Sequence, residues 1–323
     1  IKVIVEDGLG RSTSSIKLVK VGNLIPGSQI LPLADAAPHK EAHGKGNWAV
    51  WQDQRNGSWN IFARNLFDPS AEEKAITDGQ LNQERPRTDG EYVVWQSRQA
   101  DGNWDIRVKH LTSADPVILV TQSPDMDEIR PVIEWPWVVY QSKPVSDPGA
   151  PWQLMVKNLL TDTDQVLDTT TQDQLDPEIE AQRVVWQDFR DVGAGEIYLK
   201  DLVSGSVRRI TDDPGGQYHP VIENQWIVWE DNSDLQFDLY GFNLNRGVTI
   251  QLTDTSEDET RPRINQQWVV FEEDLAGEQK INLRLLSLHN QASIQLTNAA
   301  SNKEKPSMLS GKLVWTDEPN GYQ

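Results

Sequence analysis

Short runs of aliphatic and aromatic residues recur along the chain at a nearly constant spacing. Each run has a form such as VVWQD, in which aliphatic residues lead to an aromatic residue and polar residues follow it. Alternate side chains of a β-strand point to opposite faces, and these runs carry apolar side chains on both faces. They therefore predict strands that are covered on both sides. The aromatic positions are Trp51, Trp95, Tyr140, Trp186, Trp229, Phe271 and Trp315.

Other positions repeat in the same phase and divide each unit into four predicted strands, named A to D here. Strand A contains a proline nine residues before the aromatic of strand B, and strand D ends on a threonine in most units. Strand C has an aliphatic anchor after a turn rich in glycine, proline and asparagine. The anchors are Ile61, Ile106, Leu154, Ile197, Leu239 and Ile281. A four-stranded unit that repeats every 40 to 45 residues or so is typical of a β-propeller blade.

The two ends of the chain are expected to share one blade. Six units are complete between Ala42 and Thr297, after which the chain supplies only strands A and B. Ser15–Val21 and Gln29–Asp35 have the patterns of the missing strands C and D. The predicted fold is therefore all-β, a seven-bladed β-propeller of four-stranded antiparallel blades. It comprises residues 15–323, and residues 1–14 precede it as a separate N-terminal segment.

One predicted strand, Lys2–Asp7, is left over, because it resembles an additional strand B. It fits the end of an upstream immunoglobulin-like domain, or a latch on its own ring. In a third alternative, residues 1–21 join a homo-oligomer by adding strands to a neighbouring molecule. Head-to-tail repetition of that contact would build an extracellular filament.

The repeat PxI…VVW…GxxDIY…LT resembles the TolB-like propeller repeat of bacterial envelope proteins and prolyl oligopeptidases. The resemblance covers Ser15 to Asp317. It implies a propeller fold and an extracellular, cell-surface or periplasmic location in a prokaryote. The chain departs from the family in lacking the SPDG turn between strands A and B and the additional α/β domain of TolB. The partners of TolB are therefore not carried over to this chain.

Charge and composition exclude several classes of function. The chain has 30 Lys and Arg residues against 49 Asp and Glu residues, which gives a net charge of −19. Such a surface repels nucleic acid and anionic lipid, and no apolar run is long enough to insert into a membrane. Cysteine is absent, so disulfides and thiolate chemistry are excluded.

No sequence motif of an enzyme, a metal site or a cofactor site is present. His39 and His43 are the one pair of histidines spaced for a metal, and no third ligand is near them in sequence. We therefore expect no catalytic residues, no metal and no cofactor. Most tryptophans lie on strand B, where packing between blades explains them.

The residue before the proline of strand A is unusually basic for so acidic a chain. Connections between strands D and A surround one mouth of a propeller channel, so these side chains are expected to converge there. They form a candidate anion-binding site. The alternative is local ion pairing with Glu84, Glu128, Glu259 and Glu304, which the sequence favours because these acids are close by in the chain. The candidate binding residues are Arg85, Arg130, His219, Arg261 and Lys305.

The sequence thus predicts a non-catalytic scaffold outside the cytoplasm that binds a protein or a polysaccharide. A self-assembling filament subunit is one alternative. A carbohydrate-active propeller enzyme of the polysaccharide lyase type is another, with His219 as base and Arg261 or Arg130 neutralising the substrate's carboxylate.

Overall fold

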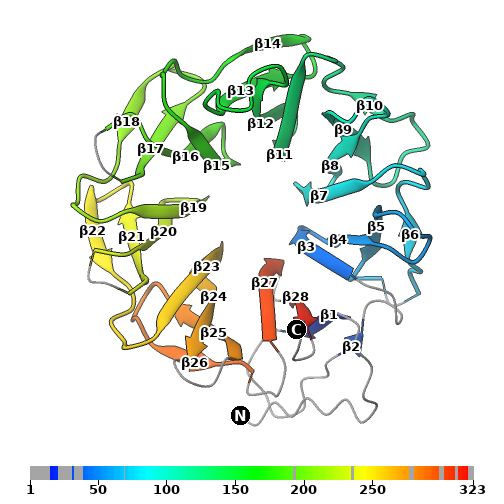
Figure 1. Cartoon of the computed structure of the whole chain (residues 1–323). Helices are drawn as coiled ribbons and strands as arrows, with labels where there is room; N and C mark the ends of the chain where they lie inside the picture. The colour runs from blue at the N-terminus through cyan, green and yellow to red at the C-terminus, as the bar shows by residue number, and fades with distance from the viewer. Residues whose placement is uncertain are drawn as a thin grey trace.

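The computed structural model describes nine stretches of the chain. They are residues 15–20, 31–32, 39–68, 70–191, 194–233, 236–275, 280–297, 302–309 and 312–318. Within these stretches every regular element is a β-strand, and the strands form antiparallel four-stranded sheets arranged as a ring (Figure 1). The predicted all-β propeller of four-stranded antiparallel blades is thereby confirmed. The strand expected at Lys2–Asp7 lies outside the described residues.

Six blades each consist of four consecutive strands, with strand A innermost and strand D outermost (Figure 1). Blade 1 contains β3 (His39–Lys45), β4 (Trp48–Asp53), β5 (Asn60–Asn65) and β6 (Lys74–Ala75). Blade 2 contains β7 (Gln83–Thr88), β8 (Tyr92–Arg98), β9 (Trp104–His110) and β10 (Ile118–Leu119). Blade 3 contains β11 (Met126–Glu134), β12 (Trp137–Pro144), β13 (Gln153–Asn158) and β14 (Thr163–Val166).

The remaining consecutive blades follow the same order. Blade 4 contains β15 (Gln174–Glu180), β16 (Arg183–Asp188), β17 (Glu196–Asp201) and β18 (Val207–Arg209). Blade 5 contains β19 (Gln217–Glu223), β20 (Trp226–Asp231), β21 (Asp238–Asn243) and β22 (Val248–Gln251). Blade 6 contains β23 (Asp258–Asn265), β24 (Trp268–Leu275), β25 (Lys280–Ser287) and β26 (Ser293–Gln295).

A composite blade joins the two ends of the chain. Its sheet order is β27 (Asn302–Leu309), β28 (Lys312–Glu318), β1 (Ser15–Lys20) and β2 (Leu31–Pro32). Strand β1 pairs with β28 from Ser15 opposite Asp317 to Lys20 opposite Lys312. The C-terminal strands A and B and the N-terminal strands C and D therefore complete one blade, in the arrangement that the sequence predicted.

The hydrophobic core is divided into clusters that lie between neighbouring blades. One cluster joins Trp51 and Phe62 of blade 1 to Leu309 and Val314 of the composite blade, and the other blade pairs are joined in the same way. Each strand B contributes an aromatic side chain that is at most 2% exposed. The alternation along strand B sends its apolar side chains to both neighbours, which is why a single blade cannot bury them alone.

Strand A of every blade carries a β-bulge with one residue in the left-handed region. The register between strands A and B shifts at each of these sites, and the bulged residue directly precedes the proline, or Ala42 in blade 1. The φ angles of these residues lie between 47° and 54°. A residue before proline ordinarily favours extended backbone, so this conformation needs support from the surrounding structure.

The polar residue after the strand B aromatic supplies that support to the next blade. The backbone N–H of Arg130 in blade 3, for example, donates to the side-chain oxygen of Gln96 in blade 2 (3.1 Å). The same bond recurs from Arg85, Asp176, Arg261 and Lys305 to the preceding blades' Gln52, Gln141, Glu230 and Glu272. The glutamine of the VVWQD motif thus connects neighbouring blades and holds the bulge.

Replacing one of these glutamines is expected to weaken the ring. Gln141 is 1% exposed and accepts the backbone N–H of Asp176 at 3.1 Å. Gln141→Ala should lower the free energy of unfolding by about 1–3 kcal/mol, because it leaves a buried N–H without a partner. Gln165→Ala, on the exposed strand β14 of the same blade, is the control and should change stability little. Equal losses in urea denaturation of both variants would contradict this role.

The threonine that ends strand D ties strand D to strand C. Its hydroxyl accepts the backbone N–H of the strand C anchor, as from Ile106 to Thr121 (2.8 Å). In blade 6 the anchor is Leu283, which bonds to Thr297, and not Ile281 as the sequence spacing predicted. That prediction was wrong because the paired part of the β24–β25 hairpin is longer than that of the B–C hairpins of the other blades. Leu283 therefore pairs with Glu272, the residue that follows the strand B aromatic.

Two carboxyl groups are buried together between blades 5 and 6. Asp238 and Glu259 are 3% and 0% exposed, and burial together with the charge of Asp238 raises the pKa of Glu259 to about 7. In three other blades the position equivalent to Glu259 is a glutamine: Gln83, Gln174 and Gln217. A neutral amide therefore fits this site.

Glu259→Gln is expected to stabilise the protein at high pH. The folded pKa of Glu259 is about 7 against an ordinary value of 4.5, so the folded state takes up a proton. Its stability must therefore fall as pH rises from about 4.5 through about 7. At about pH 8 the variant should gain about 1–3 kcal/mol, and at about pH 5 it should gain little. Glu91→Gln, at an exposed position, is the control, and a gain that does not depend on pH would refute the explanation.

Candidate functional site

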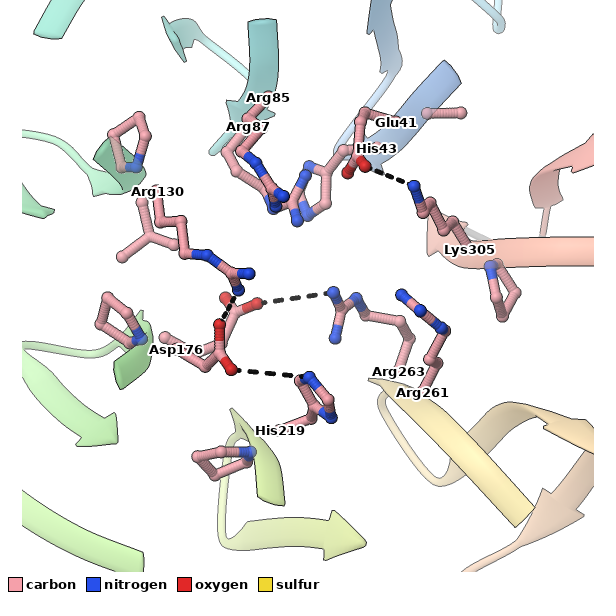
Figure 2. A pocket seen from close by; sticks show the side chains of 17 residues that line it. Glu41, His43, Arg85, Arg87, Arg130, Asp176, His219, Arg261, Arg263 and Lys305 are labelled. Atoms are coloured by element: carbon pink, nitrogen blue, oxygen red, sulfur yellow. Dashed lines mark hydrogen bonds and ion pairs between the residues drawn. The ribbon is translucent and has the colours of Figure 1, made fainter. Parts of the chain in front are cut away.

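The innermost strands surround a central channel, and its mouth on the side where strand A begins is lined by the bulged residues (Figure 2). This part of the channel is a cavity of about 230 Å³. The left-handed backbone at each bulge places one side chain per blade at the mouth. We call these seven residues the channel ring: Glu41, Arg85, Arg130, Asp176, His219, Arg261 and Lys305.

Ion pairs connect members of the channel ring across blade boundaries. Arg130 of blade 3 pairs with Asp176 of blade 4, and Lys305 of the composite blade pairs with Glu41 of blade 1 (Figure 2). His219 of blade 5 lies with Nε2 3.5 Å from Asp176. The ring is therefore a connected arrangement and not a set of separate surface charges.

Two glutamates of strand B lie behind the ring. His219 Nδ1 is 3.0 Å from Glu230, and Arg261 Nε is 3.5 Å from Glu272. Burial raises the pKa of Glu272 to about 7, and the charge of Arg261 opposes that rise. Burial lowers the pKa of His219, but the hydrogen bond and charge of Glu230 and the charge of Asp176 outweigh it, so the net shift is upward. The mouth becomes more positive as pH falls.

The electrostatic balance of the mouth is opposite to that of the whole chain. Six of its lining residues are Arg or Lys and three are Asp or Glu, whereas the chain carries a net charge of −19. The pKa of Glu41 shows the local field. Burial raises it, yet Lys305, Arg87 and Arg85 lower it more, to about 2. The site is suited chemically to anions that carry several oxygen acceptors.

A second group of side chains lies one step deeper, two residues after each bulge. We call it the inner ring: His43, Arg87, Val132, Glu178, Val221, Arg263 and Ser307. Five of these residues line both the mouth and a further cavity of about 250 Å³ toward the other end of the channel. The inner ring therefore lies where the two cavities meet.

All five predicted binding residues line the mouth, and Glu41 and Asp176 complete their ring. Two members of the ring form ion pairs that the sequence did not suggest. Arg130 and Lys305 pair with acids of the next blade, and the nearby Glu128 bonds to Thr121 instead. The inner ring was not predicted from the sequence, although a signal for it exists there, because the position after the proline carries Arg87, Glu178 and Arg263.

Two other kinds of feature are absent from the described stretches. These stretches contain no group of three or more His, Asp or Glu side chains placed to hold a metal ion. No helix long and apolar enough to cross a membrane occurs in that part of the chain. The tryptophan Trp135, on an A–B turn at the far end of the channel, stacks on Tyr92 with ring centroids 4.0 Å apart.

No protein-family model and no curated protein sequence matches this chain. Solved structures do match. A putative TolB from Agrobacterium tumefaciens has a TM-score of 0.55 at 14% identity, over 96% of this chain and 99% of its own. An oligogalacturonate lyase from Vibrio parahaemolyticus has a TM-score of 0.70 at 11% identity, over 97% of this chain and all (100%) of its own. An acylaminoacyl peptidase from Pyrococcus horikoshii has a TM-score of 0.65 at 14% identity, over 88% of this chain and 50% of its own.

These similarities concern the fold. The chain is a β-propeller, and the resemblance to TolB-like propellers is confirmed, with a TolB from Acinetobacter baumannii also among the neighbours at a TM-score of 0.52. The neighbours include enzymes as well as TolB proteins. Function must therefore be argued from the channel itself.

Proposed function

We propose that this propeller is a non-catalytic binding module of the cell envelope or extracellular space, which holds a carboxylate-bearing ligand in the mouth of its channel. The observation that carries the proposal is the convergence of Arg85, Arg130, Arg261 and Lys305 in one cavity of a strongly acidic chain. The acids of the lining neutralise only part of the charge of its six Arg and Lys residues, and an anionic ligand compensates for the rest. TolB proteins among the structural neighbours support the envelope location.

The carboxylate can belong to an acidic saccharide or to the side chains of a partner protein. Calorimetric titration with trigalacturonate and with a triglutamate peptide distinguishes these sources. We expect at least one of them to bind with an affinity that falls as salt is added, since exposed charge attraction is screened. A neutral galactose trimer and a triglutamine peptide are the matched controls.

The combined variant Arg85→Ala, Arg130→Ala, Arg261→Ala should lose this binding by at least about tenfold while its melting temperature stays close to that of the wild type. A fall in melting temperature without a specific loss of binding would mean that these residues act as structural ion pairs. Failure of both acidic ligands to bind the wild type would overturn the proposal.

The affinity for the acidic ligand is expected to fall as pH rises from about 5 to about 8. His219, whose pKa is raised above its ordinary value by the hydrogen bond and charge of Glu230, loses its proton as the pH rises, and Glu272 gains a negative charge at about pH 7, beside Arg261. Both changes make the mouth less positive. The double variant His219→Gln, Glu272→Gln should flatten the profile, and an unchanged profile would refute this assignment.

A polysaccharide lyase is the second candidate, because an oligogalacturonate lyase shares the fold and because His219 and Arg130 meet through Asp176. In that function, His219 would remove the proton next to a uronate carboxylate that Arg130 or Arg261 neutralises. The assay is the ultraviolet absorbance of the unsaturated product from polygalacturonate. Turnover that is lost in His219→Ala would support the lyase, and absence of turnover in the wild type would exclude it for this substrate.

A further inference from the structure

Two arginine side chains reach toward each other across the channel at the inner ring. Arg87 comes from β7 and Arg263 from β23, strands that lie on nearly opposite walls (Figures 1 and 2). Both residues line the mouth cavity and the deeper cavity. The junction between the cavities is therefore bounded by two guanidinium groups, each with up to five N–H donors.

Neither of these guanidinium groups makes a close ion pair within the described part of the chain. Arg87 donates to the carbonyl of Pro86 (3.0 Å), and no carboxylate among the described residues lies within 4.0 Å of it. Arg263 donates to the carbonyl of Pro262 (3.0 Å), and its contact with Glu178 is long, at 3.9 Å. Burial lowers the pKa of Arg87, and the charge of Arg263 lowers it further, while the charges of Glu41 and Glu178 oppose this fall without outweighing it. The two like charges thus destabilise each other in the ligand-free channel.

His43 adds a third donor at the same level. Its Nδ1 accepts the backbone N–H of Thr88 at 3.2 Å, which leaves the ring proton on Nε2. Burial and the charges of Arg87, Arg263 and Lys45 hold the pKa of His43 well below 6.5, so the ring is neutral and Nε2 donates. One carboxylate, Glu178, faces these three donors among the described residues of the inner ring.

We propose that the junction between the two cavities is a phosphate-binding site, in which Arg87, Arg263 and the Nε2–H of His43 hold the dianion of phosphate or of a phosphate monoester. The inference rests on the proposed function in that both need an anion to enter the mouth. It assigns a separate, deeper subsite and a different chemical group.

The arrangement favours a tetrahedral dianion over a carboxylate. A single carboxylate carries one charge in one plane and would leave one of the two arginines uncompensated. A phosphate dianion carries two negative charges, which match the two guanidinium groups. Its oxygens point in several directions, so donors from opposite walls can bind it together. Glu178 then orients Arg263 without neutralising it.

Calorimetric titration with inorganic phosphate tests the site. Arg87→Gln and Arg263→Gln should each weaken phosphate binding by at least about tenfold. Neither variant should lower the melting temperature of the ligand-free protein, because each removes one member of a repelling pair. Arg246→Gln makes the same charge change on an exposed turn outside the channel and is the control.

The charge of the ligand provides an independent readout. Phosphate gains its second charge near neutral pH, whereas sulfate is a dianion throughout. The ratio of phosphate to sulfate affinity should therefore rise between about pH 5 and about pH 8. Protonation changes of the mouth residues affect the binding of both anions alike, so they cancel in this ratio. In the wild type, phosphate should also shift the Nε2 resonance of His43.

Three results would overturn the subsite. They are no phosphate binding by the wild type, unchanged binding in both arginine variants, and a loss in Arg85→Ala, Arg130→Ala as large as that in Arg87→Gln. If phosphate fails to bind while trigalacturonate or triglutamate binds, the subsite is wrong and the proposed function stands. If phosphate binds and neither acidic ligand does, the subsite stands and the carboxylate function is wrong.

Discussion

Removal of residues 1–20 is expected to abolish cooperative folding. The deletion takes away β1, which pairs with β28 along its whole length from Ser15 to Lys20. Strand β28 would then become an open edge, although its Leu313, Val314 and Trp315 are at most 1% exposed in the closed ring. We expect the calorimetric unfolding transition to disappear, or its melting temperature to fall by more than about 10 °C, because a loss of several kcal/mol is a large part of a domain's stability.

Removal of residues 1–13 is the matched control, because it leaves β1 in place. This shorter deletion should keep the melting temperature of the full chain, and a collapse like that of the longer deletion would contradict the assigned role of β1. The same variant tests the assembly hypothesis for the N-terminal segment. If that segment links molecules into filaments, light scattering should detect polymers of the full chain and not of the shortened one. A full chain that sediments as a monomer at high concentration would exclude the hypothesis.

Trp186→Ala is expected to lower the free energy of unfolding by about 3–5 kcal/mol, as for other fully buried aromatic residues. Trp186 is 0% exposed and packs between blades 3 and 4, against Val139 of blade 3 and Tyr198 of its own blade. Its indole N–H donates to Asp188 at 2.8 Å, so the substitution removes a buried hydrogen bond as well as apolar contacts. Urea denaturation measures the loss directly.

Trp152→Ala provides the comparison for this effect. Trp152 is half-buried at the start of strand C, where Lys143 lies 4.6 Å from its ring centroid. Its replacement should cost clearly less than that of Trp186, since less apolar surface is lost. A loss under about 1 kcal/mol for Trp186→Ala would contradict its position between blades.

The blade repeat could be predicted from the sequence because its signals are local and periodic. The aromatic of strand B, the proline of strand A and the threonine of strand D recur in phase, and the seven buried aromatics lie where that phase places them. The sharing of one blade by Ser15–Lys20 and Lys312–Glu318 followed from counting incomplete units. The register of blade 6 did not follow, because a longer hairpin displaced its anchor to Leu283.

The details of the channel depend on contacts that sequence proximity does not reveal. Arg130 and Asp176 are 46 residues apart, and Lys305 and Glu41 are 264 residues apart. Ion pairing with nearby acids was therefore the natural expectation, and it did not anticipate these two pairs. The left-handed bulge was equally hidden, since a residue before proline is ordinarily extended. That conformation is explained by the interblade hydrogen bond, which a side chain such as Gln96 accepts from the backbone N–H of the bulged residue.

The central claim is that the channel mouth gathers cationic side chains in order to bind an anion. The most direct measurement is a crystal structure of the protein soaked with selenate, whose anomalous scattering locates the anion. We expect a selenate peak inside the channel, within hydrogen-bonding distance of Arg85, Arg130, Arg261 or Lys305 at the mouth, or of Arg87 and Arg263 below it. Selenate found only on the outer surface, with the channel occupied by water alone, would show that the channel mouth does not bind anions.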